Sequence, residues 1–219
     1  MNPELIEFIS ILTKEDRSEA LRFILELKEK KNLSILEVYE EFLTPALNEM
    51  TSTDNENIDI WKEHVRTSMI RTIIENMVPF LEEEQKAFGP PRGNTAAVLC
   101  PPEEYHDVGA RMAADILTIA GYRTIFVGSN TPFRVFEAGL EAERIDYVAI
   151  SISNPYHLVS TRRIVDGIRA GHPNVKIILG GNAILKHPDM SDVMKPDYIS
   201  MSLKDLTRLE GGNDHETGL

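Results

Sequence analysis

The spacing of apolar residues divides the chain into two parts. Up to about Phe88, apolar residues recur three or four positions apart, as on one face of a helix. Beyond residue 94 they form short continuous runs. The segment between the parts, residues 89–94, contains two Gly and two Pro and is typical of a hinge. We therefore predict two domains, residues 1–88 and 95–210, and a flexible tail at 211–219.

Four helices are predicted in the first part. Asn2 is a natural N-cap for the first helix, and Thr13 is a candidate cap for the second. A capping box at Ser34 opens the third helix, which Pro45 is expected to bend. The fourth helix is predicted over 58–88. Amphipathic helices with short connections pack together, so we expect an N-terminal four-helix bundle.

Short apolar runs in the second part predict five strands. They lie at 96–100, 124–127, 147–151, 176–179 and 198–201, with helices near 107–120, 132–143 and 158–170. Buried strands that alternate with helices indicate a parallel sheet covered on both faces. We expect an α/β domain of the Rossmann-like (flavodoxin-like) type, with a five-stranded parallel sheet flanked by helices.

Composition restricts the partners and the compartment. The 219 residues carry a formal net charge of −12, which repels phosphate backbones and anionic lipids. We therefore expect no direct binding to nucleic acid or membranes. Cys100 is the only cysteine, so no internal disulfide is possible, and we interpret it as a core residue. The N-terminus does not resemble a signal peptide, so we expect a cytoplasmic protein.

Candidate binding residues follow three of the predicted strands. Ligands of open parallel sheets bind at the carboxyl ends of the strands. These ends carry, in chain order, Glu104-Tyr105-His106-Asp107-Val108-Gly109, Ser151-Ile152-Ser153 and Gly180-Gly181. Taken singly, each has a structural explanation: the glycines as turn residues, Ser151 as a strand-end hydroxyl and His106 as a solvated loop residue. Their joint order favours a binding site.

These segments resemble the cobalamin-binding domain of methionine synthase, base-off mutases, methyltransferase corrinoid carriers and cobalamin-dependent photoreceptors. The family shares acid-x-His-x-x-Gly, then Ser-x-Leu, then Gly-Gly, and the chain has Ser153 in place of the Leu. Residues 43–47 and the pair Glu63-His64 resemble the helical module over the corrin ring of carriers and photoreceptors. The resemblance therefore covers nearly the whole chain.

The resemblance implies that His106 is the lower cobalt ligand of cobalamin, in its adenosyl or methyl form. Glu104 or Ser151 would support the imidazole. A carboxylate on the second ring nitrogen fixes the tautomer and raises the basicity of the ligand. Asp107 is next to the ligand. As the expected first residue of a helix, it either belongs to the site or only complements the helix dipole.

The resemblance also assigns the glycines and the helical pair. The dimethylbenzimidazole tail, displaced by the imidazole, would lie beside the sheet. Gly109, Gly180 and Gly181 would let the backbone approach this tail closely, and Ser153 belongs to the same wall. Glu63 and His64 either line the cavity above the corrin or form an exposed helix face.

Some positions depart from the family pattern. Glu104 stands where most carriers and mutases have Asp. A Glu at this position is closer to the photoreceptor and regulator branch. Light-sensing members place Trp and His on the upper face, where the chain has Thr53-Asp54. Trp61, the only tryptophan, is interpreted as bundle core. His157 is within reach of the nucleotide tail, but as a loop histidine it is interpreted as solvated.

Two functions follow from the resemblance. The first is a regulatory, photoreceptor-like module that signals to a separate protein, although the DNA-binding helix-turn-helix of such regulators is not found ahead of the first helix. The second is a methyl-carrying corrinoid protein that serves separate methyltransferases. A mutase small subunit ranks third, since it usually lacks the bundle. We expect no substrate site within the chain, and a homo-oligomer through the bundle is compatible with the resemblance.

Overall fold

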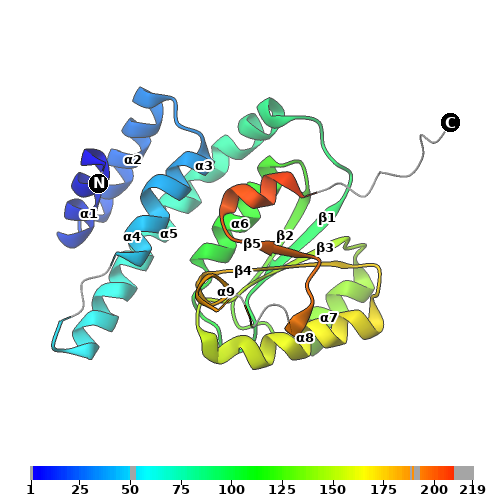
Figure 1. The fold of residues 1–219 in the computed structure, drawn as a ribbon. Coiled ribbons are helices and arrows are strands. Elements are labelled where there is room, and N and C mark those ends of the chain that lie inside the picture. Colours follow the sequence, from blue (N-terminus) through cyan, green and yellow to red (C-terminus); the bar gives the residue numbers. More distant parts are fainter. Residues whose placement is uncertain (1, 50–52, 188, 190–192, 210–219) are drawn as a thin grey trace. The chain divides into compact units, whose positions relative to one another are not determined.

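The chain folds into two compact units in the computed structural model (Figure 1). The structure describes residues 2–49, 53–187, 189 and 193–209, so the expected tail at 211–219 lies outside the described residues. A helical unit comprises residues 1–84 and an α/β unit comprises residues 85–219. The boundary falls within the last turns of the long helix α5 (Glu56–Phe88).

Capping residues position the first two helices. Helix α1 (Pro3–Thr13) begins after Asn2, whose side chain accepts a backbone N–H of the first turn, as predicted. Helix α2 (Arg17–Lys31) begins after Asp16, which plays the same role. The prediction of a cap at Thr13 is wrong, because Thr13 ends α1 and its hydroxyl donates to a carbonyl within that helix.

The third predicted helix consists of three pieces. They are α3 (Ile35–Val38), the π-helical turn η1 (Tyr39–Leu43) and α4 (Thr44–Asn48). The capping box at Ser34 is confirmed. Pro45 is the second residue after the wide turn, where its lack of an N–H interrupts regular α-helical bonding.

Helix α5 (Glu56–Phe88) carries much of the core of the helical unit. Its buried positions begin at Met69 and continue to Leu81. Trp61 precedes them by about two turns and is 64% exposed, so its interpretation as a core aromatic is wrong. The helical periodicity at Trp61 is real, but it does not reveal where along the helix the core begins.

Strands and helices alternate along the α/β unit, as predicted. The strands are β1 (Thr95–Leu99), β2 (Arg123–Gly128), β3 (Tyr147–Ser151), β4 (Lys176–Gly180) and β5 (Tyr198–Ser200). The helices are α6 (Val108–Ile119), α7 (Phe133–Ala142), α8 (Leu158–Gly171) and α9 (Asn182–Lys186), with 3-10 turns η2 (Pro155–His157) and η3 (Leu203–Arg208). All strand pairs are parallel in the flavodoxin-like order β2-β1-β3-β4-β5, which confirms the predicted fold.

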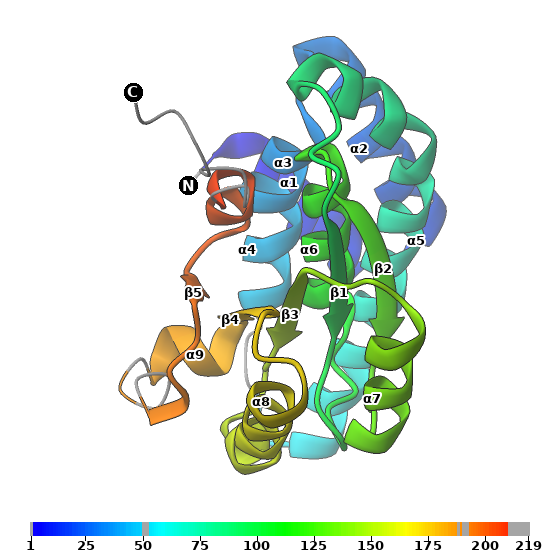
Figure 2. The ribbon, with the colours of Figure 1, turned by 90° about the vertical axis from the view of Figure 1, so that its right-hand side faces the viewer.

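Helices cover both faces of this sheet. In Figure 1, α6 and η3 lie above the strands and α7 and α8 below them, and Figure 2 shows the same layers from the side. Leu99, Ile150 and Leu179 belong to the core that includes residues of α7 and α8. Side chains alternate along a strand, so Ser151 and Gly180 face the α6 side. The loops after β1, β3 and β4 meet at one edge of the sheet.

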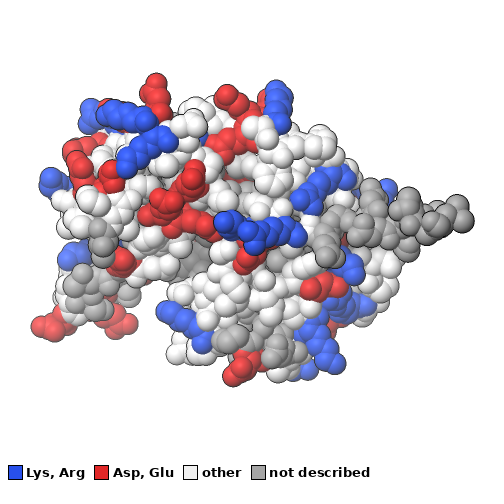
Figure 3. Space-filling view, turned by 45° about the horizontal axis from the view of Figure 1, so that its top comes forward, with Lys and Arg blue, Asp and Glu red and all other residues white. Residues whose placement is uncertain are grey.

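Charged side chains of both signs are mixed on the surface. On the face shown in Figure 3, Lys and Arg lie among Asp and Glu, and the described residues form no continuous basic area there. This agrees with the formal charge of −12. Within the described part of the chain, none of the helices has the length and hydropathy needed to cross a membrane.

Arg92 fixes the hinge segment against the α/β unit. Its guanidinium donates hydrogen bonds of 2.6–3.2 Å to the carbonyls of Ala120, Thr207 and Leu209. It also lies over the ring of Tyr122, 5.1 Å from the centroid. These carbonyls follow α6 or lie at the end of η3, so a single side chain holds both elements.

We expect Arg92→Leu to lower the free energy of unfolding of the α/β unit by about 2–3 kcal/mol. A hydrogen bond to a charged donor contributes roughly 1.5–3 kcal/mol, and the three bonds of Arg92 are not additive because they share one partly exposed side chain. Hydrogen exchange of the strand peptides in increasing urea measures this loss. The control is Arg144→Leu, since the Arg144 side chain is 91% exposed and its pairing with Asp146 is long, at 3.8 Å. Equal protection in both variants would contradict the assigned role.

Candidate functional site

The carboxylate of Glu104 is the centre of the candidate site. It follows β1 and is 0% exposed. Its Oε1 atom lies 2.7 Å from Nδ1 of His106 and accepts the His106 backbone N–H at 3.0 Å. Its Oε2 atom accepts the backbone N–H groups of Ser153 at 3.0 Å and Asn154 at 2.9 Å. One side chain therefore joins the loop after β1 to the loop after β3. Ser153 and Asn154 follow Glu104 by 49 and 50 residues in the sequence.

These contacts set the charge of Glu104 and the tautomer of His106. Burial raises the pKa of Glu104, but hydrogen bonds from the His106 side chain and from three backbone amides outweigh it and lower the pKa to about 2. An ionised carboxylate only accepts hydrogen bonds, so Nδ1 of His106 carries the proton and Nε2 carries the lone pair. The His106 side chain is 52% exposed. The site thus presents an accessible imidazole in the tautomer suited to a metal.

The main chain on both sides of the imidazole is held by further contacts. The Asn130 N–H donates to the Glu104 carbonyl at 2.9 Å, and the Asn130 side chain accepts the Glu103 N–H at 2.9 Å. The loop after β2 is therefore tied to the loop after β1. The Ser153 hydroxyl donates to the His106 carbonyl at 3.4 Å.

Cys100 comes directly after β1 and is fully buried. Burial raises the pKa of its thiol to about 12, and the charges of Asp107 and Glu104 act in the same direction. A thiol that stays protonated is a poor nucleophile and a poor metal ligand. The interpretation of Cys100 as a core residue is confirmed.

Small residues line the α6 face at the same edge of the sheet. A Cβ atom at Gly109 would lie 3.9 Å from the Ser151 hydroxyl, so these two residues face each other. Gly181 has a φ of +96°, and a Cβ there would lie 2.5 Å from the Ile152 carbonyl oxygen. Only glycine fits this position without strain, because the loop after β4 touches the main chain after β3.

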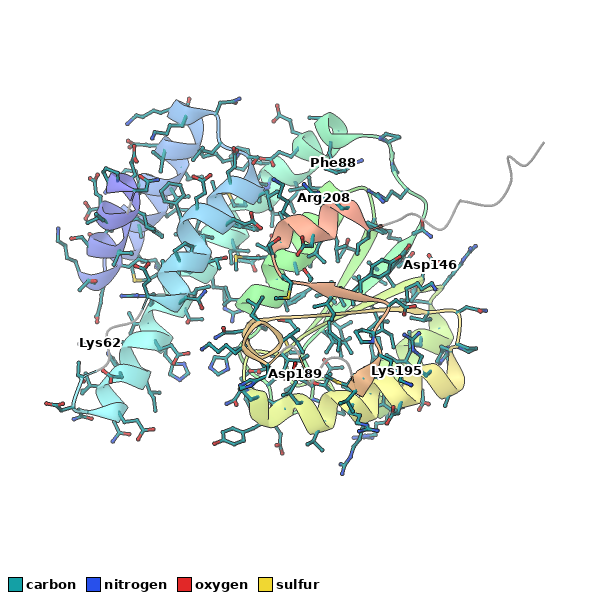
Figure 4. The ribbon with its side chains drawn as sticks, in the orientation of Figure 1. Lys62, Phe88, Asp146, Asp189, Lys195 and Arg208 are labelled. Atoms are coloured by element: carbon teal, nitrogen blue, oxygen red, sulfur yellow. The ribbon has the colours of Figure 1, made fainter. Side chains whose placement is uncertain are left out.

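A cavity of about 220 Å³ lies beside β4, β5 and η3. It adjoins Gly180, since a Cβ at Gly180 would lie 3.4 Å from Ser200 in the cavity wall. Arg208, on η3, contributes to the lining (Figure 4). The cavity is smaller than the roughly 300–1,000 Å³ of a complete small-molecule site, so it suits one part of a larger ligand. The lining residues are Ile178, Tyr198, Ile199, Ser200, Asp205, Arg208 and Leu209.

The structure brings Glu104, His106 and Ser153 together and adds two residues that the sequence analysis did not assign to the site. Asn154 contributes a backbone N–H, and His157 places its Nε2 atom 4.0 Å from Oε2 of Glu104. The His157 side chain is only 16% exposed, so its interpretation as a solvated histidine is wrong. An Asn directly before a Pro signals a turn, and this turn brings the histidine back toward the sheet.

The other assigned residues have different surroundings. Asp107 is the N-cap residue of α6 and is 8% exposed, so it precedes the helix and is not its first residue. Ser151 lies beside Gly109, whereas both oxygens of Glu104 bind N–H groups from elsewhere. Glu63, half-buried, and His64, exposed, lie on α5 in the helical unit, and their position above a cofactor stays a prediction.

Comparison with known families identifies the domain that carries these residues. The model of the B12-binding domain matches residues 94–203, which are 110 of the 219 residues and include Glu104, His106 and the loop after β3. The chain belongs to the B12-binding domain family. Cobalamin is therefore its cofactor.

Similar proteins include a regulator and corrinoid proteins. The HTH-type transcriptional repressor CarA of Myxococcus xanthus is 26% identical over 165 residues, or 74% of this chain. The chain spans about half, 53%, of that relative's length. The monomethylamine corrinoid protein of Methanosarcina barkeri has a similar fold, with a TM-score of 0.76, 13% identity and coverage of 93% of this chain and 94% of that one. The methanol:cobalamin methyltransferase complex MtaBC of the same organism gives a TM-score of 0.50 at 14% identity, over 95% and 78% of the chains.

The residues at this edge of the sheet fit cobalamin. The half-exposed imidazole of His106 has a fixed tautomer and a buried carboxylate partner, the arrangement that favours a histidine ligand to a transition metal. Gly181 allows close approach of main chains beside it, and the cavity adjoining Gly180 offers space for part of a large ligand.

We expect acid to release the loop after β3. The pKa of Glu104 is lowered from 4.5 to about 2, so its contribution to stability is complete above about pH 4.5 and is lost as the pH falls toward 2. The backbone amide shifts of Ser153 and Asn154, followed by NMR over this range, measure the transition. The control Glu104→Gln is neutral at every pH and should show no such transition. A midpoint near pH 4.5 in the unmodified protein would contradict the assigned hydrogen bonds.

Proposed function

We propose that the chain holds cobalamin base-off, with His106 as the lower axial ligand, and signals the state of the cofactor to a separate protein. The observation that carries the first half is the 2.7 Å contact between Nδ1 of His106 and the buried, ionised Glu104. This contact directs the proton to one ring nitrogen and leaves the other as the metal-binding atom.

The displaced tail of the cofactor has a place in this proposal. In this proposal the tail lies along the α6 face, beside Gly109 and Ser151, and ends in the cavity that adjoins Gly180. Ser200, Asp205 and other lining residues supply polar groups, and Ile178 and Leu209 supply apolar surface. When bound, cobalamin supplies a cobalt centre whose upper ligand can change while the protein holds its lower face.

We expect His106→Ala to lose the base-off, His-on absorption spectrum after reconstitution with methylcobalamin. The side chain is half-exposed, so its removal leaves the fold intact, as circular dichroism will verify. His187→Ala is the matched control, because His187 is exposed and lies after α9. A mutant spectrum identical to that of the unmodified protein would rule out His106 as the lower ligand.

The signalling half of the proposal is supported by the sequence relationship to CarA and by the Glu at position 104 of the Glu104-x-His106 motif. The output partner would be a regulatory protein, and a homo-oligomer and a cytoplasmic location remain part of the proposal. A change of upper ligand would bias one of two arrangements of the protein.

We expect the oligomeric state or the affinity for the partner to differ between the apo, hydroxo-, methyl- and adenosylcobalamin forms, in darkness or after illumination. A cofactor shifts an equilibrium only by its differential affinity for two states. Analytical ultracentrifugation of the four forms measures the first quantity, and pull-down with candidate regulators measures the second. Identical behaviour of all four forms would exclude a sensor.

A methyl-carrying corrinoid protein is the second candidate. Its support is the fold similarity to the monomethylamine corrinoid protein, which extends over 93% of the chain. The partner would then be a methyltransferase. Acceptance of a methyl group by the reduced, reconstituted protein in the presence of a methyltransferase would favour the carrier over the sensor.

A further inference from the structure

Two histidines face the same buried carboxylate. Nδ1 of His106 lies 2.7 Å from Oε1 of Glu104, and Nε2 of His157 lies 4.0 Å from Oε2 of the same side chain. The second distance is longer than a hydrogen bond but within the range of ion-pair and dipole interactions. Because Glu104 is 0% exposed and the His157 side chain only 16% exposed, little water screens this interaction.

The position of His157 is set by the turn that carries it. Its backbone N–H donates to the Asn154 carbonyl at 3.0 Å, and its own carbonyl accepts the hydroxyl of the buried Thr161 at 2.8 Å. Asn154 in turn donates its N–H to Glu104. The turn η2 is therefore fastened to the carboxylate at one end and to α8 at the other, with the imidazole held between them.

We propose that His157 is a positioning residue that acts through Glu104: its Nε2–H group draws negative charge toward Oε2 and so weakens the pull of Oε1 on the Nδ1 proton of His106. The inference deepens the proposed function and rests on His106 being the cobalt ligand. A carboxylate favours a nitrogen that bears hydrogen, so the geometry assigns an N–H group to Nε2 of His157.

Removal of His157 should strengthen the binding of cobalt by His106. Four N–H groups at 2.7–3.0 Å, from His106, Ser153 and Asn154, keep Glu104 in place when His157 is removed. What changes is the charge on Oε1. More charge on Oε1 makes the His106 imidazole a stronger base and a stronger ligand. A purely structural role predicts the opposite, because a loosened loop would weaken ligation.

Titration of the full chain with aquocobinamide tests this. This corrinoid has no nucleotide tail, so the absorbance of the cobalt–imidazole species reports on His106 and not on the tail cavity. We expect His157→Leu to bind more tightly, by up to about tenfold, the lower end of the effect of outer-shell partners on metal affinity. His157→Gln, which keeps an N–H at a similar distance, should restore the affinity of the unmodified protein. Tyr156→Leu is the control, since Tyr156 lies on the same turn but is 88% exposed.

Unchanged or weaker binding by His157→Leu would overturn the proposal. So would amide shifts of Ser153 and Asn154 in the cofactor-free variant that match those of Glu104→Gln, because they would show that Glu104 had moved. Absence of the cobalt–imidazole absorbance in the unmodified protein, or its persistence in His106→Ala, would instead refute the proposed ligand, so the two failures are distinguishable.

Discussion

The burial of one ionised carboxylate determines the geometry at the ligand-binding edge of the sheet. Removing a carboxylate from water costs several kcal/mol unless hydrogen bonds replace the lost hydration. Glu104 obtains these bonds from the loop after β1 and from the loop after β3. The fold cannot keep Glu104 ionised without holding the two loops together. The His106 imidazole is therefore oriented before any cofactor binds, which reduces the cost of ordering it on binding.

The support of the Glu104 carboxylate comes mostly from the main chain, and this explains a departure from the family pattern. Two of the donors to Glu104 are the backbone N–H groups of Ser153 and Asn154. Any residue except proline supplies such a donor. A serine in place of the usual leucine at 153 therefore leaves the carboxylate satisfied, and its hydroxyl adds a contact to the His106 carbonyl. The resemblance suggested Ser151 as an alternative support, but Ser151 faces Gly109 instead.

The sequence was sufficient for the fold because buried parallel strands are continuous apolar runs, a signal that local sequence carries. The five strands fall within one or two residues of their predicted bounds. The errors concern features that depend on distant contacts. Trp61 has a helical setting but no local mark of where the core begins. His157 is half-buried beside a partner 53 residues earlier in the chain. The pair Glu104 and His106 was predictable, whereas the amides that hold Glu104 were not, because every residue but proline carries one.

The two candidate functions make the same demand on the lower face of the cofactor and different demands on the upper face. A carrier and a sensor both need an imidazole that remains oriented when cobalt is absent, and the tethered His106 would meet that need for either.

The difference between a carrier and a sensor must therefore arise at the upper face of the cofactor, which the resemblance assigns to the helical unit. There, the exposed Trp61 and the half-buried Glu63 lie within one turn of α5, while Thr53-Asp54 replace the Trp and His of light-sensing members. A tryptophan two residues from Glu63 lies on a different side of the helix from it, so Trp61 is no simple substitute for the tryptophan of light-sensing members. The side chains that meet the upper ligand, more than His106, would therefore distinguish a protein that senses this ligand from one that carries it.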